Sequence, residues 1–468
     1  MNIVIGAAFL LVALGLLGGS HYYVWRRTVR DTTARGGWPR RVGTVLCVVL
    51  PLVSFAALSA RRGVPIELER ALSWPGYMWL PVLLYLVLGL LVGEAVRPLL
   101  LRLLRRRAQR AAGSGNAEGA GAEAALAARV PVPVGASADG PAPAGTAVPD
   151  GVPARDGVPA RDGASARDGA APEGAAAPDG GAEAAPQAAS QAAEVSRRLF
   201  VSRTVAVAAG AVAVATVGHG TRTVFRGPTV KRITVPLAKL APRDAGFRIA
   251  VVSDIHISPL LGRAHTQRIV DAVNGTQPDL VAIVGDLVDG SVQNLGRDAE
   301  PLAQLRARHG SYFVTGNHEY FGDAGEWVDF VRELGVHPLE NARVEMPGFD
   351  LAGVNDVSAE GTADAPDYEA ALGDRDTSRA SVLLAHQPVM IHEAVRHGVD
   401  LQLSGHTHGG QLWPGNLIAG LANPTVAGLE RYGDTQLYVS RGAGAWGPPV
   451  RVGAPSDITV VELASLRA

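Results

Sequence analysis

The sequence predicts an α/β domain at residues 230–468, preceded by an N-terminal α-helical region that spans a membrane. Beyond residue 230, short runs rich in Val, Ile, Leu and Tyr alternate with polar stretches that are compatible with helices. This alternation is typical of strands buried in an α/β protein. Before residue 110, three apolar runs each approach or reach the roughly 20 residues that cross the hydrocarbon of a bilayer. A chain of 468 residues exceeds one ordinary domain, so several regions are expected.

Residues 1–110 are expected to hold three transmembrane helices, over the apolar runs 3–19, 43–60 and 76–96. No basic segment precedes the first run, and aromatic residues follow it at 21–25, as at a membrane interface. A secretory signal sequence is the alternative for this first run, and soluble core helices are the alternative for all three.

Two clusters of arginine predict the orientation of these helices. One cluster lies in the loop after the first run and the other follows the third run, whereas the second loop has fewer positive charges. Because Lys and Arg accumulate on the cytoplasmic side of a membrane, the N-terminus is expected outside and the segment after residue 97 in the cytoplasm. The clusters comprise Arg26, Arg27, Arg30, Arg35, Arg40 and Arg41, and then Arg97, Arg102, Arg105, Arg106, Arg107 and Arg110.

Residues 111–195 consist of Ala, Gly, Pro, Asp and Arg with almost no large apolar side chain. From Asp150 a six-residue unit recurs as DGVPAR, DGVPAR and DGASAR. Such a segment cannot bury enough apolar area to offset the entropy lost on ordering. It is therefore expected to be a disordered linker, with a short solenoid as the alternative.

Residues 196–220 combine a paired-arginine motif with a further apolar run. Arg197 and Arg198 are followed by Leu199, Phe200 and an Ala/Val run at 205–217, which resembles a twin-arginine export signal. A fourth membrane helix with basic flanks is the plainer interpretation of the same residues. Both interpretations place the following domain outside the cytoplasm. In a third interpretation the run at 205–217 does not enter the membrane, and the domain lies in the cytoplasm.

The composition excludes several kinds of site. The chain has 43 Lys and Arg against 44 Asp and Glu, so no nucleic-acid partner is expected. Cys47 is the only cysteine, which rules out a disulfide within the chain and a zinc site built on several thiolates. A bound metal would have to use His, Asp and Asn. Ten of the twelve histidines lie beyond residue 250.

Residue types that bind metals follow five of the predicted strands. In α/β sheets, ligands bind outside the carboxyl ends of the strands, so these residues are expected to meet at one rim. The predicted strand at 247–252 leads to Asp254 and His256, the strand at 280–284 to Asp286, and the strand at 312–315 to Asn317 and His318. The strand at 381–385 leads to His386, and the strand at 401–403 to His406 and His408. Two further strands are predicted at 437–440 and 458–461, and helices at 263–274 and 323–334.

The residue types suit two divalent metals. Residues two apart on an extended chain point the same way, so Asp254 and His256 can bind one ion together. The carboxylate of Asp286 has two oxygens and can bridge two ions, and Asn317 offers a neutral amide oxygen. This mixture of nitrogen and oxygen ligands favours Mn, Fe, Zn or Co over Cu(I) or Ca.

Five blocks, in this order, resemble the calcineurin-like metallophosphoesterase superfamily. The match covers residues 245–465, and the segments 384–388 and 405–411 are most similar to its bacterial membrane-associated branch, which includes transmembrane proteins with a metallophosphoesterase domain. The blocks are Asp254-x-His256, Gly285-Asp286-x-x-Asp289, Gly316-Asn317-His318-Glu319, His386 and Gly405-His406-x-His408.

The resemblance implies a four-layer fold, in which two mixed β-sheets pack face to face and helices flank them. It also implies a role for each matched residue. His318 would lie beside the phosphate as general acid or charge stabiliser, and Asp289 would orient a neighbouring ligand unless it only caps a turn. Asp254, His256 and His408 would hold the first metal, Asn317, His386 and His406 the second, and Asp286 would bridge both.

The implied function is a metal-dependent phosphoesterase, in which a hydroxide activated by two metals attacks phosphorus. The membrane helices favour a phosphodiester of a lipid or a cell-envelope component as substrate. Arg441 and Arg451 flank a Gly/Pro-rich loop at 442–449 and are candidates to bind the phosphate. Two alternatives are an envelope-binding module with a vestigial metal site, and a membrane sensor or scaffold.

Overall fold

The structure, a computed structural model, describes residues 2–59, 65–127 and 181–466. Most of the expected linker, residues 128–180, lies outside the described residues, and its two flanks continue neighbouring helices. The chain divides into two compact units: residues 1–97 together with 202–468, and residues 98–201. Within the second unit, Glu194 accepts hydrogen bonds from Arg105 and Arg198 at 2.6 and 2.8 Å.

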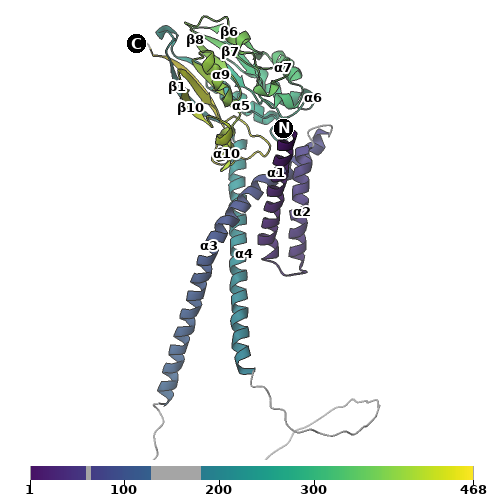
Figure 1. Cartoon of the computed structure of the whole chain (residues 1–468), viewed down its shortest axis with the longest axis vertical. Helices are drawn as coiled ribbons and strands as arrows, with labels where there is room; N and C mark the ends of the chain where they lie inside the picture. The colour runs from purple at the N-terminus through teal and green to yellow at the C-terminus, as the bar shows by residue number, and fades with distance from the viewer. Residues whose placement is uncertain (1, 60–64, 128–180, 467–468) are drawn as a thin grey trace, which may run out of the picture. The chain divides into compact units, whose positions relative to one another are not determined.

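The helices of the N-terminal half are long (Figure 1). Among the described residues, the segments Trp38–Ser59, Ile66–Arg110 and Gln191–Phe225 have the length and composition to cross a membrane. These segments indicate an integral membrane protein. The helices are α1 Asn2–Val24, continued by a π-helical turn at Trp25–Arg30, α2 Trp38–Ser59, α3 Ile66–Ala127 and α4 Gly181–Phe225.

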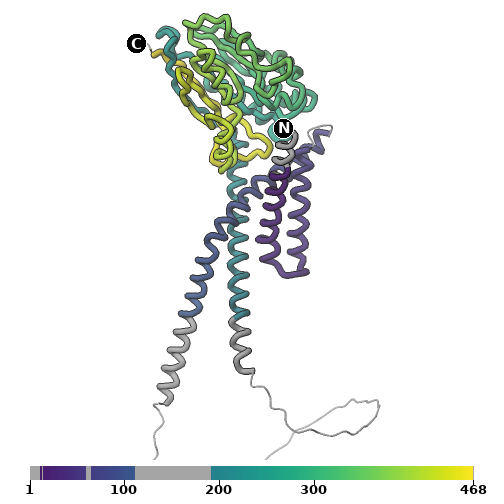
Figure 2. Tube along the Cα trace, viewed as in Figure 1, coloured from purple at the N-terminus to yellow at the C-terminus, as the bar shows by residue number. Residues whose placement is uncertain are grey.

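Residues 229–465, which follow α4 and are coloured from teal to yellow in Figure 2, are here called the sheet domain. They form two six-stranded sheets. Both sheets combine parallel and antiparallel neighbours. The first has the order β1-β12-β2-β3-β4-β5, with β1 Thr229–Leu237, β2 Phe247–Val252, β3 Leu280–Val284, β4 Ser311–Val314, β5 His337–Pro338 and β12 Asp457–Ser465. The second has the order β10-β11-β9-β8-β7-β6, with β6 Ala342–Met346, β7 Phe349–Gly353, β8 Ala380–Leu384, β9 Leu401–Ser404, β10 Gly428–Tyr432 and β11 Thr435–Val439.

The core between the sheets follows from the two-residue period of the strands. Ile249 and Val251 of β2 point into this core, whereas Ala250 and Val252 point to the opposite face. Phe247 of the first sheet meets Phe349 of the second edge to face, with ring centroids 5.0 Å apart. The strands therefore need to be apolar on both faces, as their near-continuous Val, Ile and Leu runs predict.

Helices cover the outer face of each sheet. The first sheet packs against α5 Arg263–Gly275, α6 Val292–Ala299 and α7 Ala324–Glu333, where Trp327 is among the largest buried side chains. The second packs against α8 Tyr368–Leu372 and α9 Ile391–Arg396. The predicted four-layer fold, with two mixed sheets face to face and flanking helices, is confirmed. A further short helix, α10 Gly415–Ala422, has no buried residue.

Candidate metal centre

The carboxyl ends of parallel strands from both sheets meet at one rim of the sheet domain. In the first sheet, the amide of Asp254 donates to the carbonyl of Gly285 at 3.1 Å, which joins the loops after β2 and β3. In the second sheet, the amide of Gly405 donates to the carbonyl of His386 at 2.9 Å. The sheets are linked where the amide of His406 donates to the carboxylate of Asp254 at 3.0 Å. The remaining block joins them where the amide of His318 donates to the carboxylate of Asp286 at 2.9 Å.

The backbone at this rim adopts a conformation that side chains other than glycine rarely take. Eight non-glycine residues of the described chain have positive φ, and five of them are predicted metal ligands. Asp and His tolerate this region better than most residues, but it still costs energy. The surrounding contacts must therefore hold the loops in place. The five are Asp254 (φ 51°), His256 (49°), Asp286 (51°), His406 (72°) and His408 (51°).

Two glycines are required because ligand side chains occupy the space that a Cβ would take. A Cβ at Gly405 would overlap Ser253 and the carboxylate of Asp254. A Cβ at Gly316 would overlap the carboxylate of Asp286. The space beside each of these glycines therefore belongs to the side chains of the ligand loops.

The first group of ligand atoms comes from Asp254, His256 and His408, all buried, with candidate ligand atoms within 4.8 Å of one another. Nε2 of His256 lies 2.9 Å from Nε2 of His408. Nε2 of His408 lies 3.3 Å from Oδ1 of Asp254. This is the set predicted for the first metal.

The second group comes from Asp286, His386 and His406, again within 4.8 Å. Nε2 of His386 lies 3.2 Å from Oδ2 of Asp286. Nδ1 of His406 lies 2.8 Å from Oδ1 of Asn317, which places the predicted amide ligand beside this group. Oδ2 of Asp286 also lies 3.7 Å from Nε2 of His256, so the carboxylate stands between the two groups.

The nitrogen chemistry of two histidines fits a metal. Nδ1 of His386 lies 2.8 Å from the carbonyl of Val284, which fixes the proton on Nδ1. Its Nε2 is buried and faces Oδ2 of Asp286 at 3.2 Å, so the nitrogen that a metal would use lies inside the second group. Nδ1 of His256 likewise lies 3.0 Å from Oδ1 of Asp289, which leaves Nε2 for a metal. Carboxylates and imidazole nitrogens buried this closely together suit bound divalent cations.

His408 differs from these two histidines. Its Nδ1 lies 3.0 Å from Nη2 of Arg451, and a guanidinium can only donate. A metal on Nε2 of His408 therefore requires either a small shift of Arg451 or an imidazolate that Arg451 stabilises.

His318 and Asp289 form a third contact at the centre. Oδ1 of Asp289 lies 2.7 Å from Nδ1 of His318, and Nε2 of His318 lies 3.9 Å from Oδ2 of Asp286. Burial lowers the pKa of His318, but the Asp289 and Asp286 carboxylates outweigh it and raise that pKa. Burial raises the pKa of Asp289, but its two imidazole neighbours hold that pKa well below the usual range. His318, Asp286 and His256 also have ligand atoms within 4.8 Å of one another.

The two arginines proposed for substrate lie in different surroundings. Arg451 is buried at 2% exposure, and its guanidinium donates to the backbone carbonyls of His408 and Gly444 at 3.0 and 2.6 Å. It thus packs behind a ligand loop instead of facing solvent. Arg441 is partly exposed and lines a cavity of about 240 Å³ together with Gly409 and Trp413.

Two side chains at the centre were not assigned a role from sequence. The carboxylate of Glu319 accepts hydrogen bonds from the amides of Asp286, Leu287 and Gly316 at 3.1, 2.8 and 2.6 Å. Burial and the nearby Asp286 raise the pKa of Glu319 to about 7. Trp446 lies edge to face with His318, with ring centroids 5.7 Å apart. Glu319 ends the Gly-Asn-His-Glu block, which was its only signal in the sequence.

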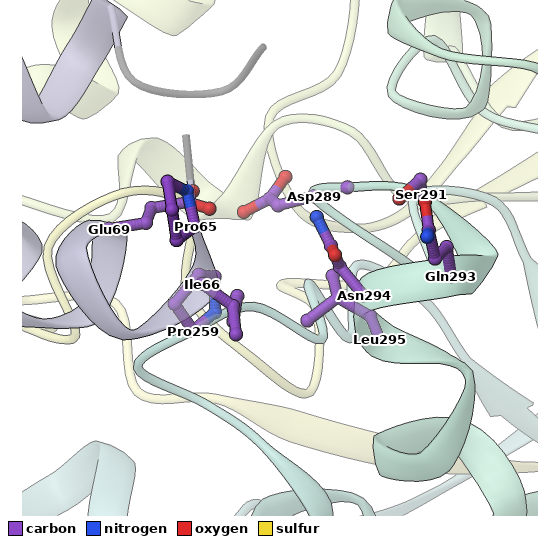
Figure 3. Close-up of a pocket in the computed structure, with 10 residues that line it drawn as sticks. Pro65, Ile66, Glu69, Pro259, Asp289, Ser291, Gln293, Asn294 and Leu295 are labelled. Atoms are coloured by element: carbon purple, nitrogen blue, oxygen red, sulfur yellow. The ribbon is translucent and has the colours of Figure 1, made fainter. Parts of the chain in front are cut away.

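Two cavities adjoin Asp289. One, of about 410 Å³, is lined by Pro65, Ile66 and Glu69 on one side and by Asp289, residues 290–291 and residues 293–295 on the other (Figure 3). The second, of about 310 Å³, is lined by Leu58 and Ser59 of α2 and by Asp289, Gly290, His318, Phe321 and Gly322.

Comparison with known proteins finds the same family in sequence. The family model described as calcineurin-like phosphoesterase matches residues 247–410. The chain is 41% identical over 250 residues to a Danio rerio transmembrane protein with metallophosphoesterase domain, covering 50% of this chain and 57% of the relative. It is 40% identical over 239 residues to an uncharacterized metallophosphoesterase of Helicobacter pylori strain J99, covering 50% and 64%.

A shorter relative is matched over most of its length. An uncharacterized metallophosphoesterase of Aquifex aeolicus is 34% identical over 239 residues, which cover 50% of this chain and 91% of that protein. By contrast, the chain spans somewhat more than half the length of the Danio rerio and Helicobacter pylori relatives.

Proposed function

Because this chain belongs to the calcineurin-like metallophosphoesterase family, we propose that it is a hydrolase that cleaves a phosphate ester with two divalent metal ions. One observation carries this proposal. Seven buried or partly buried side chains with metal-ligand chemistry converge from the ends of β2, β3, β4, β8 and β9. Buried carboxylates and imidazoles without a cation would be costly, so a bound metal explains their arrangement.

The ligand sets follow the two groups of atoms. Asp254, His256 and His408 would hold one ion, whereas Asn317, His386 and His406 would hold the other. Asp286 lies between the groups and would contribute to both. When bound, two such ions lower the pKa of a shared water and neutralise charge on the phosphoryl oxygens. The ligand chemistry suits Mn, Fe, Zn or Co.

His318 would donate the proton that the leaving oxygen needs when its bond to phosphorus breaks. Its Nδ1 faces Asp289, so Nε2 remains the nitrogen available to substrate. The raised pKa of His318 favours the doubly protonated ring, which carries a proton on Nε2 for donation. Asp289 would orient His318 and His256 together through one oxygen.

We propose separate roles for the two arginines. Arg451 would position the loop of His408, because its donors already point to buried protein acceptors. Arg441 would contact the phosphate or the leaving group, since it lines an open cavity beside Gly409.

The proposed substrate is a phosphodiester of a lipid or another cell-envelope component. The cavity beside His318 also has Leu58 and Ser59 in its wall, from the last turn of a candidate membrane span. A substrate in that cavity would therefore lie next to the end of a membrane helix. The exposed ring of Phe321 adds apolar surface for an acyl or prenyl chain.

The proposed organisation has four regions, with the catalytic domain at 230–468 outside the cytoplasm. Membrane spans at 1–110, a linker at 111–195 and a further span at 196–220 would precede it. Arginines on both flanks of the linker support a cytoplasmic location for it. Reporter enzymes fused after residue 468 test this arrangement, and activity only of a cytoplasm-dependent reporter would contradict it.

The function is tested with full-length wild-type chain and the Asp286→Asn variant, each supplied with Mn²⁺. We expect the wild type to release nitrophenol from bis(p-nitrophenyl) phosphate faster than from p-nitrophenyl phosphate, and the variant to be nearly inactive. Preference for the monoester would contradict the diesterase assignment. If both proteins bound cell envelope equally and neither hydrolysed an ester, the envelope-binding alternative would be favoured.

A further inference from the structure

The short helix α10 has an unusual surface for a protein in water. Its sequence, GNLIAGLA, has one polar side chain, and none of its residues is buried. Leu417, Ile418 and Leu421 are 66%, 71% and 88% exposed. Single exposed apolar residues are ordinary, but three on one short helix form a patch that needs an apolar partner.

The chain around α10 lacks charge. Between His408 and Glu430 there is no Asp, Glu, Lys or Arg. Trp413, which is also exposed, precedes the helix. An uncharged helix led by a tryptophan is the composition that lipid interfaces select, because the indole ring favours the headgroup level and Leu and Ile favour hydrocarbon.

Contacts with two candidate membrane spans identify the partner. The hydroxyl of Tyr85, near the middle of the apolar run in α3, donates to the carbonyl of Trp413 at 3.0 Å. Leu412 and Val452 pack against the cluster that contains Tyr85 of α3 and Val217 of α4. The segment that leads into α10 therefore contacts apolar side chains of two candidate membrane spans.

The exposure of neighbouring residues of α4 also indicates that this contact lies within the membrane-spanning part of the helices. Ala213 is buried in the cluster with Tyr85 and Val450, whereas Val212 and Val214 on either side of it are exposed. In a membrane span, such exposed valines face lipid. Because α10 begins three residues after Leu412, it lies within a few residues of the same level.

We propose that α10 inserts into the bilayer beside α3 and α4, with Leu417, Ile418 and Leu421 in contact with lipid hydrocarbon. A helix satisfies its own backbone hydrogen bonds, so its insertion leaves few polar groups unpaired. The amide side chain of Asn423 donates to the carbonyl of Ala419, which pairs the polar group at the end of the helix. The contact would hold the sheet domain, and the loop of His408, against the membrane surface.

The single cysteine of the chain makes the proposal testable. A Cys47→Ser background receives one cysteine, Ile418→Cys, which is labelled with the fluorophore NBD in the full-length chain. The chain is reconstituted in phosphatidylcholine vesicles, with or without doxyl groups on the acyl chains. Val212→Cys, exposed on α4, serves as the lipid-facing control, and Val395→Cys, exposed on α9, as the aqueous control.

We expect doxyl lipids to quench most of the fluorescence of the label at 418, and iodide to quench little of it. The label at 212 should behave in the same way. The label at 395 should be quenched by iodide and little by doxyl lipids. Strong quenching by iodide at 418 would overturn the proposal. Protection from both quenchers would also overturn it, because a protein partner or a second copy would then cover α10. Neither result depends on hydrolysis, so the outcome is separate from that of the proposed function.

A second variant tests the apolar contact itself. Leu421→Cys is labelled with and without the additional change Ile418→Lys. The lysine should expose the label at 421 to iodide, because a charge at this site opposes insertion. Unchanged protection from iodide would contradict insertion of this face. Unchanged circular dichroism in both proteins checks that the fold is intact.

Discussion

The carboxylate of Asp289 faces Nδ1 of His318 at 2.7 Å. The same oxygen lies 3.0 Å from Nδ1 of His256, a proposed metal ligand. One carboxylate therefore sets the proton position of both the proposed general acid and a proposed ligand. This arrangement connects proton transfer to metal binding, and the two can be separated by substitution.

Replacing His318 with Ala should lower turnover about 10²–10⁴-fold while metal content stays near that of the wild type. The imidazole is proposed to donate a proton and to bind no ion. Hydrolysis rates and elemental analysis of the same preparation measure both quantities. Asn317→Ala is the matched control, because that residue is a proposed ligand and its loss should reduce metal content. Loss of metal in His318→Ala would show that His318 is a ligand.

Asp289→Asn should lower activity about 10–100-fold, as substitutions of groups that orient metal ligands typically do. The amide keeps the size of the side chain and an acceptor oxygen but removes the negative charge that faces both imidazoles. Both metal affinity and the rate with saturating metal should fall, since the charge that makes His256 a stronger ligand and raises the pKa of His318 is lost. A rate that recovers fully at high Mn²⁺ would contradict the proposed link to His318.

Asp286→Asn should impair the site more than the loss of a ligand to a single ion. Asp286 lies 3.2 Å from His386 in one group and 3.7 Å from His256 in the other. Metal titration followed by calorimetry should show weaker binding of both ions. Retention of one ion with unchanged affinity would indicate that Asp286 does not bridge.

The two arginines should respond differently to substitution. Arg451→Met removes donors from several buried carbonyls, each costing about 1–3 kcal/mol when left unpaired, so the thermal midpoint should fall by several degrees. Arg441→Met should leave the midpoint unchanged and raise KM, because Arg441 lines an open cavity. A normal midpoint for Arg451→Met, with only KM raised, would restore the expectation that Arg451 binds substrate.

The sequence was sufficient to predict the strands that carry the centre, because they are buried on both faces and therefore strongly apolar. The predicted runs at 247–252 and 280–284 coincide with β2 and β3. Ligand positions could be predicted because each follows a strand directly, and the chain itself fixes that relationship.

Other parts depend on contacts between distant residues. The sequence of β1 contains Lys231 and Arg232 and lacks the apolar run of a buried strand, so β1 was not predicted. It forms a strand because it pairs in parallel with β12, more than 200 residues away in the chain. The edge strands β6 and β10 pair with the next strand along the chain, but their charged side chains give them no apolar run by which to predict them. Burial of Arg451 beneath His408 has no local signature, because the two residues lie 43 positions apart.

The central claim is that one chain holds two metal ions between Asp254, Asp286 and the surrounding histidines. Electron paramagnetic resonance of the full-length chain titrated with Mn²⁺ tests this claim most directly, because ions about 3.5–4 Å apart are magnetically coupled. We predict about two Mn²⁺ per chain and a coupled spectrum that is lost in Asp286→Asn. A spectrum of isolated Mn²⁺ at one ion per chain, or no binding at all, would contradict the account.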